Sequence, residues 1–180
     1  MRPSFISILS GLSIVGVHSA KTHPVDLVEK DAVIDTALKF YLSLDEKSEA
    51  LMRSVTTKYL IFDGTLFANI GLGAPTSLVG IDTIAPGLLA AFTNITTMHN
   101  VGTFHVELES KEANVTAYAL AYHYKELEEP RENPRNNYLM GNRFEGSLVK
   151  DQGVWKIVRV KLYPFFQSGN IEVMGLNQIQ

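Results

Sequence analysis

Two different spacings of hydrophobic residues divide this chain into a helical first half and a strand-rich second half. In the first half, apolar residues recur every three or four positions along Val25–Leu44, which is typical of an amphipathic helix. Glu46–Val55 and Ile81–Phe92 are predicted as a second and a third helix, and Asp45 is placed to cap the second. A short strand over Lys58–Phe62 and an irregular, glycine-rich loop over Thr65–Gly80 are predicted between them.

The second half is rich in β-branched and aromatic residues, in stretches that turn-forming residues separate. We predict four strands, over Thr96–Ser110, Asn114–Lys125, Tyr138–Lys150 and Val154–Phe166. Helices followed by a run of antiparallel hairpins indicate an α+β fold, with N-terminal helices packed on one face of a strongly curved antiparallel sheet. Such a cone-shaped fold encloses a pocket that suits a small ligand.

The alternation of side chains along the first of these strands bears on His99. Strict alternation places His99 on the face opposite to Val106, so the imidazole points outward if the apolar residues face the helices. A β-bulge reverses this register, and Gly102 is a suitable position for one. We therefore expect His99 to face the helices only if the strand is bulged near Gly102.

The first 20 residues have the pattern of a secretory signal peptide. Met1–Ala20 begins with one cation, continues with a short uncharged apolar stretch and ends in small residues. The apolar part is shorter than the roughly 20 residues that a membrane-spanning helix needs. We therefore expect cleavage after Ser19 or Ala20, a single domain over residues 21–180, and a secreted protein or one in the lumen of the secretory pathway.

Charge and composition narrow the partners of the mature domain. The full chain has a net charge of −3, which becomes −4 when the signal peptide takes Arg2 with it. No run of Lys or Arg is left, which argues against nucleic acid or a membrane as a partner. The chain has no cysteine, which excludes thiolate chemistry. Two sequons begin at Asn94 and Asn114, and we expect both asparagines to be exposed and glycosylated.

Several short motifs resemble those of a known family. They are Phe40–Asp45, Ala50-Leu51, Phe62–Gly64, Thr97–His99, Gly153–Ile157, Ser168–Asn170 and Val173–Gly175. In order and spacing they resemble SnoaL-like domains of the NTF2-like superfamily, fungal members in particular, over residues 25–175. The resemblance implies a cone of helices over a curved antiparallel sheet. It also implies dehydratase, isomerase, aldol-type cyclase or pericyclase activity on polyketides and terpenoids, although the family includes non-catalytic members.

The resemblance further implies roles for individual residues. Asp45 and His99 fall on a carboxylate and a histidine of scytalone dehydratase, a fungal relative. The second histidine of that enzyme falls on Ala119, its loop tyrosine on Gly64 and its substrate-binding asparagine on Phe144. These three differences argue against the same substrate. The family also tends to carry asparagine where this chain has a threonine at position 103. The implied pocket walls are Tyr41, Phe67 and Phe144.

Asp45 and His99 are the residues that we expect to carry chemistry. An imidazole moves protons near neutral pH, and a carboxylate orients it and stabilises its cation. The alternative is that Asp45 caps a helix and that His99 is a core residue. His105 and His123 are interpreted as surface or rim residues. The chain has no spacing typical of metal ligands, so no metal site is expected.

Together these observations predict an enzyme of fungal secondary metabolism that acts without a cofactor on a hydrophobic polyketide or terpenoid intermediate. The expected reaction is a dehydration, an isomerisation or a cyclisation, one version being quinone-methide formation followed by hetero-Diels–Alder cycloaddition. The alternative is a secreted, non-catalytic carrier of a hydrophobic small molecule, and a homodimer is left open. A hydrogen bond between Asp45 and His99 inside a cavity favours the enzyme, whereas separated or exposed residues favour the carrier.

The signal-peptide interpretation predicts a processed amino terminus. Mass spectrometry of the secreted protein should find Ala20 or Lys21 as its first residue. Glycosidase treatment should then lower the mass if Asn94 or Asn114 carries a glycan. An intact Met1 on the secreted product would contradict the interpretation.

Overall fold

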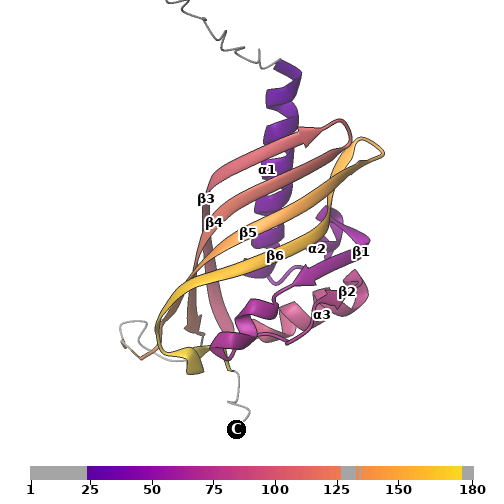
Figure 1. Ribbon diagram of the computed structural model, residues 1–180. Coiled ribbons are helices and arrows are strands. Elements are labelled where there is room, and N and C mark those ends of the chain that lie inside the picture. The colour runs from indigo at the N-terminus through magenta and orange to yellow at the C-terminus, as the bar shows by residue number, and fades with distance from the viewer. Residues whose placement is uncertain (1–23, 127–132, 134, 176–180) are drawn as a thin grey trace, which may run out of the picture.

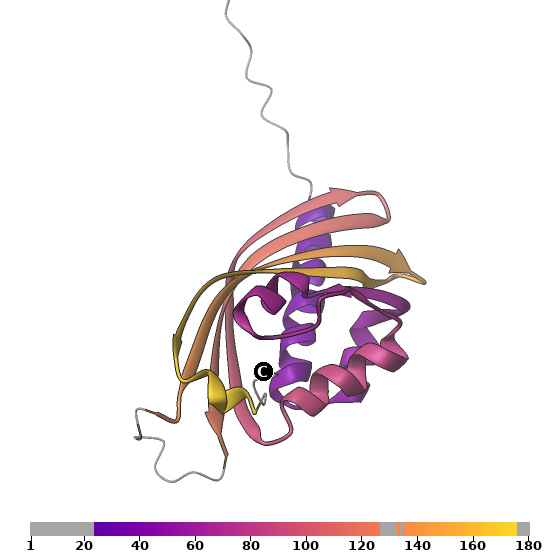
Figure 2. The ribbon, with the colours of Figure 1, turned by 60° about the horizontal axis from the view of Figure 1, so that its bottom comes forward.

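A computed structural model describes residues 24–126, 133 and 135–175 of the chain. The segment interpreted above as a signal peptide, Met1–Ala20, lies outside the described residues. Within them, helices lie against one face of a six-stranded, strongly curved sheet (Figure 1). The sheet and the helices together form a cone (Figure 2).

The predicted helices and long strands are all present. The helices are α1 (Pro24–Asp45), α2 (Glu49–Val55) and α3 (Ile81–Ala91), with the 3-10 helices η1 (Thr65–Ile70) and η2 (Ile171–Met174). The strands are β1 (Thr56–Asp63), β2 (Leu78–Val79), β3 (Ile95–Glu109), β4 (Glu112–Lys125), β5 (Tyr138–Asp151) and β6 (Val154–Gly169). Their order across the sheet is β2-β1-β6-β5-β4-β3. The expected α+β fold is confirmed. The sheet is mixed rather than purely antiparallel, because β1 pairs parallel to β6.

Two local predictions differ from the structure. Asp45 does not cap α2 but is the last residue of α1. The N-cap of α2 is Ser48, whose Oγ accepts a hydrogen bond from the N–H of Leu51 at 3.2 Å. A short hydroxyl side chain reaches back to the first turn easily, which makes serine a good cap. The segment predicted as an irregular loop, Thr65–Gly80, contains η1 and the short strand β2.

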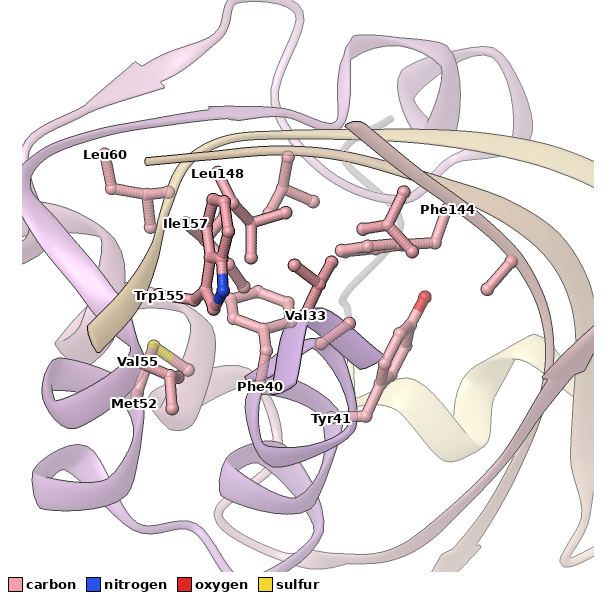
Figure 3. Packing of buried hydrophobic residues seen from close by; sticks show 14 of the residues in the cluster. Val33, Phe40, Tyr41, Met52, Val55, Leu60, Phe144, Leu148, Trp155 and Ile157 are labelled. Carbon is pink, nitrogen blue, oxygen red and sulfur yellow. The ribbon is translucent and has the colours of Figure 1, made fainter. Parts of the chain in front are cut away.

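The main hydrophobic core lies between α1, α2 and the concave face of the sheet (Figure 3). Val33, Ala37 and Phe40 of α1 are fully buried, and their spacing places them on one stripe of the helix. Ala117 and Ala119 of β4 belong to the same core. Side chains this small leave room for the helix close to the sheet.

α1 is attached to the sheet near its beginning by an ionic contact. The carboxylate of Glu29 accepts hydrogen bonds from Lys150 Nζ at 2.6 Å and from Trp155 Nε1 at 2.8 Å. Both donors belong to the hairpin of β5 and β6. This contact fixes the start of α1 on the sheet, so that the helix carries its other end, Asp45, to a defined place.

β3 contains the bulge that an inward His99 requires. Its pairing with β4 shifts register between Gly102 and His105, and Thr103 adopts a φ of 55°. As a result, His99 borders the interior of the cone while Val106, further along the strand, is also buried in the core. The predicted bulge is confirmed, and it turns His99 inward.

Thr103 carries a β-branched side chain at positive φ, which costs roughly 1–2 kcal/mol. We expect Thr103→Asn to raise the free energy of unfolding by about 0.5–1 kcal/mol, because asparagine tolerates this conformation better. Urea denaturation measures the difference. Thr103→Val keeps the β-branch and is the control, which should bring no gain. If Thr103→Asn is no more stable than the wild type, the backbone conformation of Thr103 is not a source of strain.

Candidate active site

A cavity of about 390 Å³ lies inside the cone, between the helices and the concave face of the sheet. Most of its lining side chains are apolar. The lining residues with polar side chains are Tyr41, Thr76, His99, His123, Tyr138 and Asn142. None of the lining residues is Asp, Glu, Lys or Arg. Burying a charge without a partner is costly, so this cavity suits an uncharged, largely apolar ligand.

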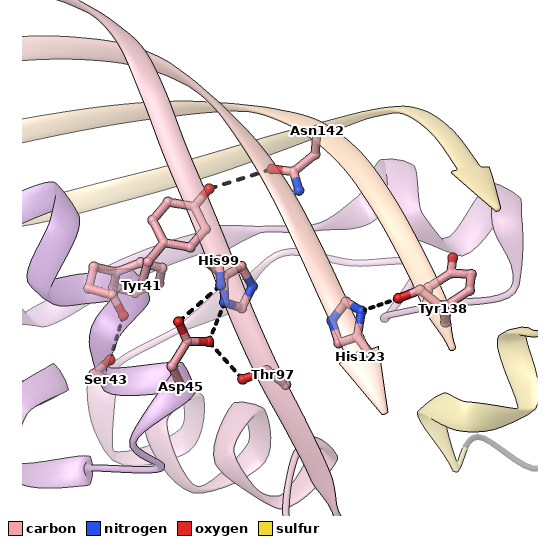
Figure 4. Close-up of polar contacts among 9 residues, drawn as sticks. Tyr41, Ser43, Asp45, Thr97, His99, His123, Tyr138 and Asn142 are labelled. Atoms are coloured by element: carbon pink, nitrogen blue, oxygen red, sulfur yellow. Dashed lines mark hydrogen bonds and ion pairs between the residues drawn. The ribbon is translucent and has the colours of Figure 1, made fainter. Parts of the chain in front are cut away.

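The Asp45 carboxylate, at the end of α1, binds two residues of β3 (Figure 4). Its Oδ1 lies 2.6 Å from Nδ1 of His99 and accepts a hydrogen bond from Thr97 Oγ1 at 2.7 Å. Its Oδ2 accepts from the backbone N–H of His99 at 3.0 Å. Because β3 is an edge strand, this N–H has no neighbouring strand to bond and is available to the helix.

The electrostatics of this contact determine which nitrogen of His99 carries the proton. Partial burial acts to raise the pKa of Asp45. The side-chain hydrogen bond and charge of His99, with the backbone N–H and Thr97, outweigh it and hold this pKa below its ordinary value. An ionised carboxylate only accepts hydrogen bonds, so Nδ1 of His99 is the donor. Whenever the ring is neutral, Nε2 therefore has the lone pair, and the ring borders the cavity.

A second histidine lies in the same cavity, so the prediction of a surface or rim position for His123 is wrong. His123 is only 4% exposed, and its Nδ1 donates to the carbonyl oxygen of Tyr138 at 3.1 Å. Its ring stacks on Phe92 and lies 6.1 Å from the ring of His99, centroid to centroid. Burial lowers the pKa of His123 to about 4, although the carbonyl contact opposes this. His123 is therefore neutral near pH 7, with Nε2 as an acceptor.

Tyr41 and Asn142 add a polar pair to the same wall (Figure 4). The Tyr41 hydroxyl donates to Oδ1 of Asn142 at 3.5 Å, and the Tyr41 ring lies 5.0 Å from the ring of His99. Burial raises the pKa of Tyr41 above its ordinary value, so the hydroxyl stays protonated. Since Oδ1 of Asn142 faces Tyr41, the amide Nδ2 is the group that can donate to a ligand oxygen.

The predicted pocket walls are only partly found. Tyr41 and Phe67 border the cavity, but Phe144 does not. The Phe144 ring is fully buried in the core and packs against Tyr41 with centroids 5.4 Å apart. Ala119, implied as the counterpart of a second histidine, is also a core residue. β4 brings a histidine to the cavity four residues later, at His123.

The sequence did not predict four of the polar lining residues, Thr76, His123, Tyr138 and Asn142, and alternation along the strands could have found His123 and Asn142. His123 lies two residues after Ala121 and therefore shares its face, which points inward. Asn142 lies two residues before Phe144 and shares the inward face of β5 for the same reason. Both positions become visible once the inward face of each strand is fixed.

Other candidate residues lie away from the cavity. The side chain of His105 is 74% exposed, as predicted, and Asn94 and Asn114 are exposed as well. The described residues contain no group of three or more His, Asp or Glu side chains able to hold a metal ion. Across the same part of the chain, no helix is both long and apolar enough to span a membrane.

The buried, neutral state of His123 makes stability depend on pH. Its pKa falls from an ordinary 6.5 to about 4 on folding, so between these values the unfolded chain binds more protons. Stability therefore falls as the pH falls through this window, by about 2 kcal/mol between pH 7 and pH 4.5 from this residue.

His123→Gln tests this dependence, because glutamine can donate to the Tyr138 carbonyl but does not titrate. Between pH 7 and pH 4.5, the free energy of unfolding measured with urea should fall by about 2 kcal/mol less in the variant than in the wild type. An equal fall in the free energy of unfolding of the two proteins would show that His123 does not cause the pH dependence.

The fold and the cavity can be compared with known proteins. The protein Kfla4162 from Kribbella flavida superposes with a TM-score of 0.70 at 20% identity, covering 83% of this chain and 98% of that one. A protein from Novosphingobium aromaticivorans, provisionally described as a scytalone dehydratase, gives 0.65 at 19%, covering 81% and 95%. The LinA-type3 hexachlorocyclohexane dehydrochlorinase of Novosphingobium barchaimii gives 0.62 at 14%, covering 79% and 90%. At these identities the likeness shows the fold alone.

The family follows from the sequence itself. No curated protein matched the chain. The family model of the SnoaL-like domain, in contrast, matches residues 25–161, a span that holds every polar side chain of the cavity wall. This chain therefore belongs to the SnoaL-like domain family of the NTF2-like superfamily.

Proposed function

We propose that this protein is an enzyme that moves protons on a neutral, largely apolar small molecule, by dehydration, isomerisation or a related elimination, without a cofactor. One observation carries the proposal: the Asp45–His99 hydrogen bond, 2.6 Å long, at the wall of an apolar cavity. Two proteins of the same fold are described as a dehydratase and a dehydrochlorinase, names that denote eliminations. Eliminations begin or end with a proton transfer at carbon.

In the proposed reaction His99 is the base. Its Nε2 removes a proton from a carbon atom beside a carbonyl group, and the electron pair forms a double bond as the leaving group departs. The Asp45 carboxylate is a positioning residue, which holds the ring in one tautomer and stabilises the imidazolium that forms. When the leaving group is a hydroxyl, the same imidazolium returns the proton to it and water is released.

The other polar groups orient the substrate. The amide Nδ2 of Asn142 donates to the carbonyl oxygen, on which negative charge develops as the proton leaves. The Nε2 of neutral His123 accepts a hydrogen bond from a substrate hydroxyl. The apolar remainder of the wall supplies affinity and excludes water, which strengthens these contacts.

The alternative functions explain fewer of these features. A structural domain with a filled cone predicts no cavity, whereas this one has about 390 Å³. A carrier needs the apolar walls but has no use for a buried imidazole bound to an ionised carboxylate. Removing both groups from water costs free energy that a carrier would avoid with apolar side chains.

We propose a secreted enzyme of fungal-type secondary metabolism acting on a polyketide or terpenoid intermediate, in which hetero-Diels–Alder cycloaddition can follow the elimination. The exposed positions of Asn94 and Asn114 support glycosylation in the secretory pathway. Confinement of two reacting groups in the cavity would favour a cycloaddition, because it removes the entropy cost of bringing them together.

His99→Ala tests the base directly with 5-nitrobenzisoxazole, a small neutral aromatic compound. A base removes its single C–H proton from the five-membered ring, the N–O bond breaks, and a coloured phenolate appears. We expect the variant to lose at least about 10²-fold in rate, because a positioned general base contributes this much or more. Asp45→Asn should lose less, since the proton acceptor stays in place.

His105→Ala is the matched control, because this histidine is exposed and should leave the rate unchanged. Binding of the neutral fluorescent dye N-phenyl-1-naphthylamine should persist in all three variants, since the apolar walls provide its affinity. A His99→Ala protein that binds the dye and keeps the full rate would show that His99 is not the base.

A further inference from the structure

The cavity opens to solvent between two segments, at an opening that we call the mouth. Of the lining residues, only four are exposed. Gly73 and Thr76 lie between η1 and β2, while Gly87 and Ala91 lie on α3. α3 and the segment leading to β2 border the same open end of the cone (Figure 2). Since Gly87 and Ala91 are four residues apart, they share one face of the helix, and this face forms one side of the mouth.

Gly87 lowers the stability of the helix in which it lies. Glycine inside a helix costs roughly 1 kcal/mol relative to alanine, and Gly87 is an interior residue of α3. A Cβ atom added there meets nothing within 4 Å, and its φ is not positive. Neither packing nor backbone conformation therefore requires glycine at this position.

Gly169 shows what a structural requirement for glycine looks like in the same protein. Its φ of 91° strains any other residue, and a Cβ atom added there would collide with the backbone carbonyl of Asn137. The open space around Gly87 is the opposite case. A stabilising alanine fits there, and because Gly87 also lines the cavity, we look for a functional reason for the glycine.

Two functional reasons for Gly87 make different predictions. One is flexibility, because Pro86 precedes it and proline-glycine positions allow a helix to bend. The other is width, because Gly87 lines the cavity at an exposed position, where a large side chain would narrow the mouth. If flexibility matters, alanine already impairs ligand binding. If width matters, only a large side chain does.

The small residues around the mouth favour width. Gly73 lines the cavity from the other segment, and Ala91 continues the helix face of Gly87, so three of the four exposed lining residues have little or no side chain. The cavity behind them, about 390 Å³, falls in the range of roughly 300–1,000 Å³ that holds drug-sized ligands. A wide mouth is needed only if the ligand is itself wide.

We propose that Gly87 is a specificity-determining residue, whose missing side chain keeps the mouth wide enough for bulky, uncharged ring compounds. The inference rests on the proposed function, because it assumes that the cavity binds the substrate. It adds the class of substrate: a neutral compound with fused or linked rings, rather than a small or linear one.

The test compares two neutral fluorescent probes of different size, N-phenyl-1-naphthylamine and the smaller 2-naphthol. Gly87→Leu should weaken binding of the larger probe at least about tenfold and slow its association, while binding of 2-naphthol changes less than about twofold. Ala91→Leu, one turn along the same rim, should act in the same direction. Ala90→Leu is the matched control, because Ala90 is also exposed on α3 but does not line the cavity.

Gly87→Ala separates width from flexibility. It should raise the Tm by about 2–4 °C, because the helix loses its glycine, and should bind both probes as the wild type does. If Gly87→Ala weakens binding of the larger probe as much as Gly87→Leu does, the proposal is wrong and flexibility is the reason for the glycine. Equal binding by Gly87→Leu and Ala90→Leu would also overturn it, while the proposed function stood. A wild-type protein that binds neither probe would remove the apolar-ligand function and this inference with it.

Discussion

The end of α1 is held against the edge strand β3 by the carboxylate of Asp45, and the geometry of the site depends on this contact. An acidic residue is unfavourable at a helix C-terminus, where the backbone carbonyls already carry partial negative charge, and α1 has no basic residue in its last turn. Donors on Thr97 and His99 compensate for this by binding the carboxylate. The last residue of the helix is therefore locally unfavourable but contributes to the site, a combination that is common at functional positions.

Two features elsewhere in the chain make this contact possible. The hydrogen bonds of Glu29 to the hairpin of β5 and β6 fix the other end of α1, so the position of Asp45 does not depend on the site alone. The bulge at Thr103 reverses the alternation of β3 and brings His99 to the inward face. A strained residue in the strand and an acid at the helix end thus serve the same imidazole. The hydrophobic core does not need the acid at the helix end, whereas the bulge also lets Val106 join that core.

The sequence predicted what depends on local spacing and failed where distant segments meet. The helices and long strands followed from periodicity, and the bulge followed from a conflict between His99 and Val106 in that periodicity. The parallel pairing of β1 with β6 has no local signal, because the residue pattern of a strand does not show which strand it pairs with. The inward position of His123 required knowing which face of β4 the helices cover. The pairing of Asp45 with His99 came from family resemblance, since no spacing could bring a helix end to a strand.

The parallel pair also has a consequence for how the chain reaches its native state. Thr56 of β1 pairs with Ile157 of β6, so this part of the sheet joins early and late segments of the chain. During synthesis, β1 can pair only with the short strand β2 until β6 has left the ribosome. Contacts between segments so distant in sequence carry a large loop-closure cost and slow folding. The hairpins of β3 to β6 can form from neighbouring segments, but the cavity is completed last.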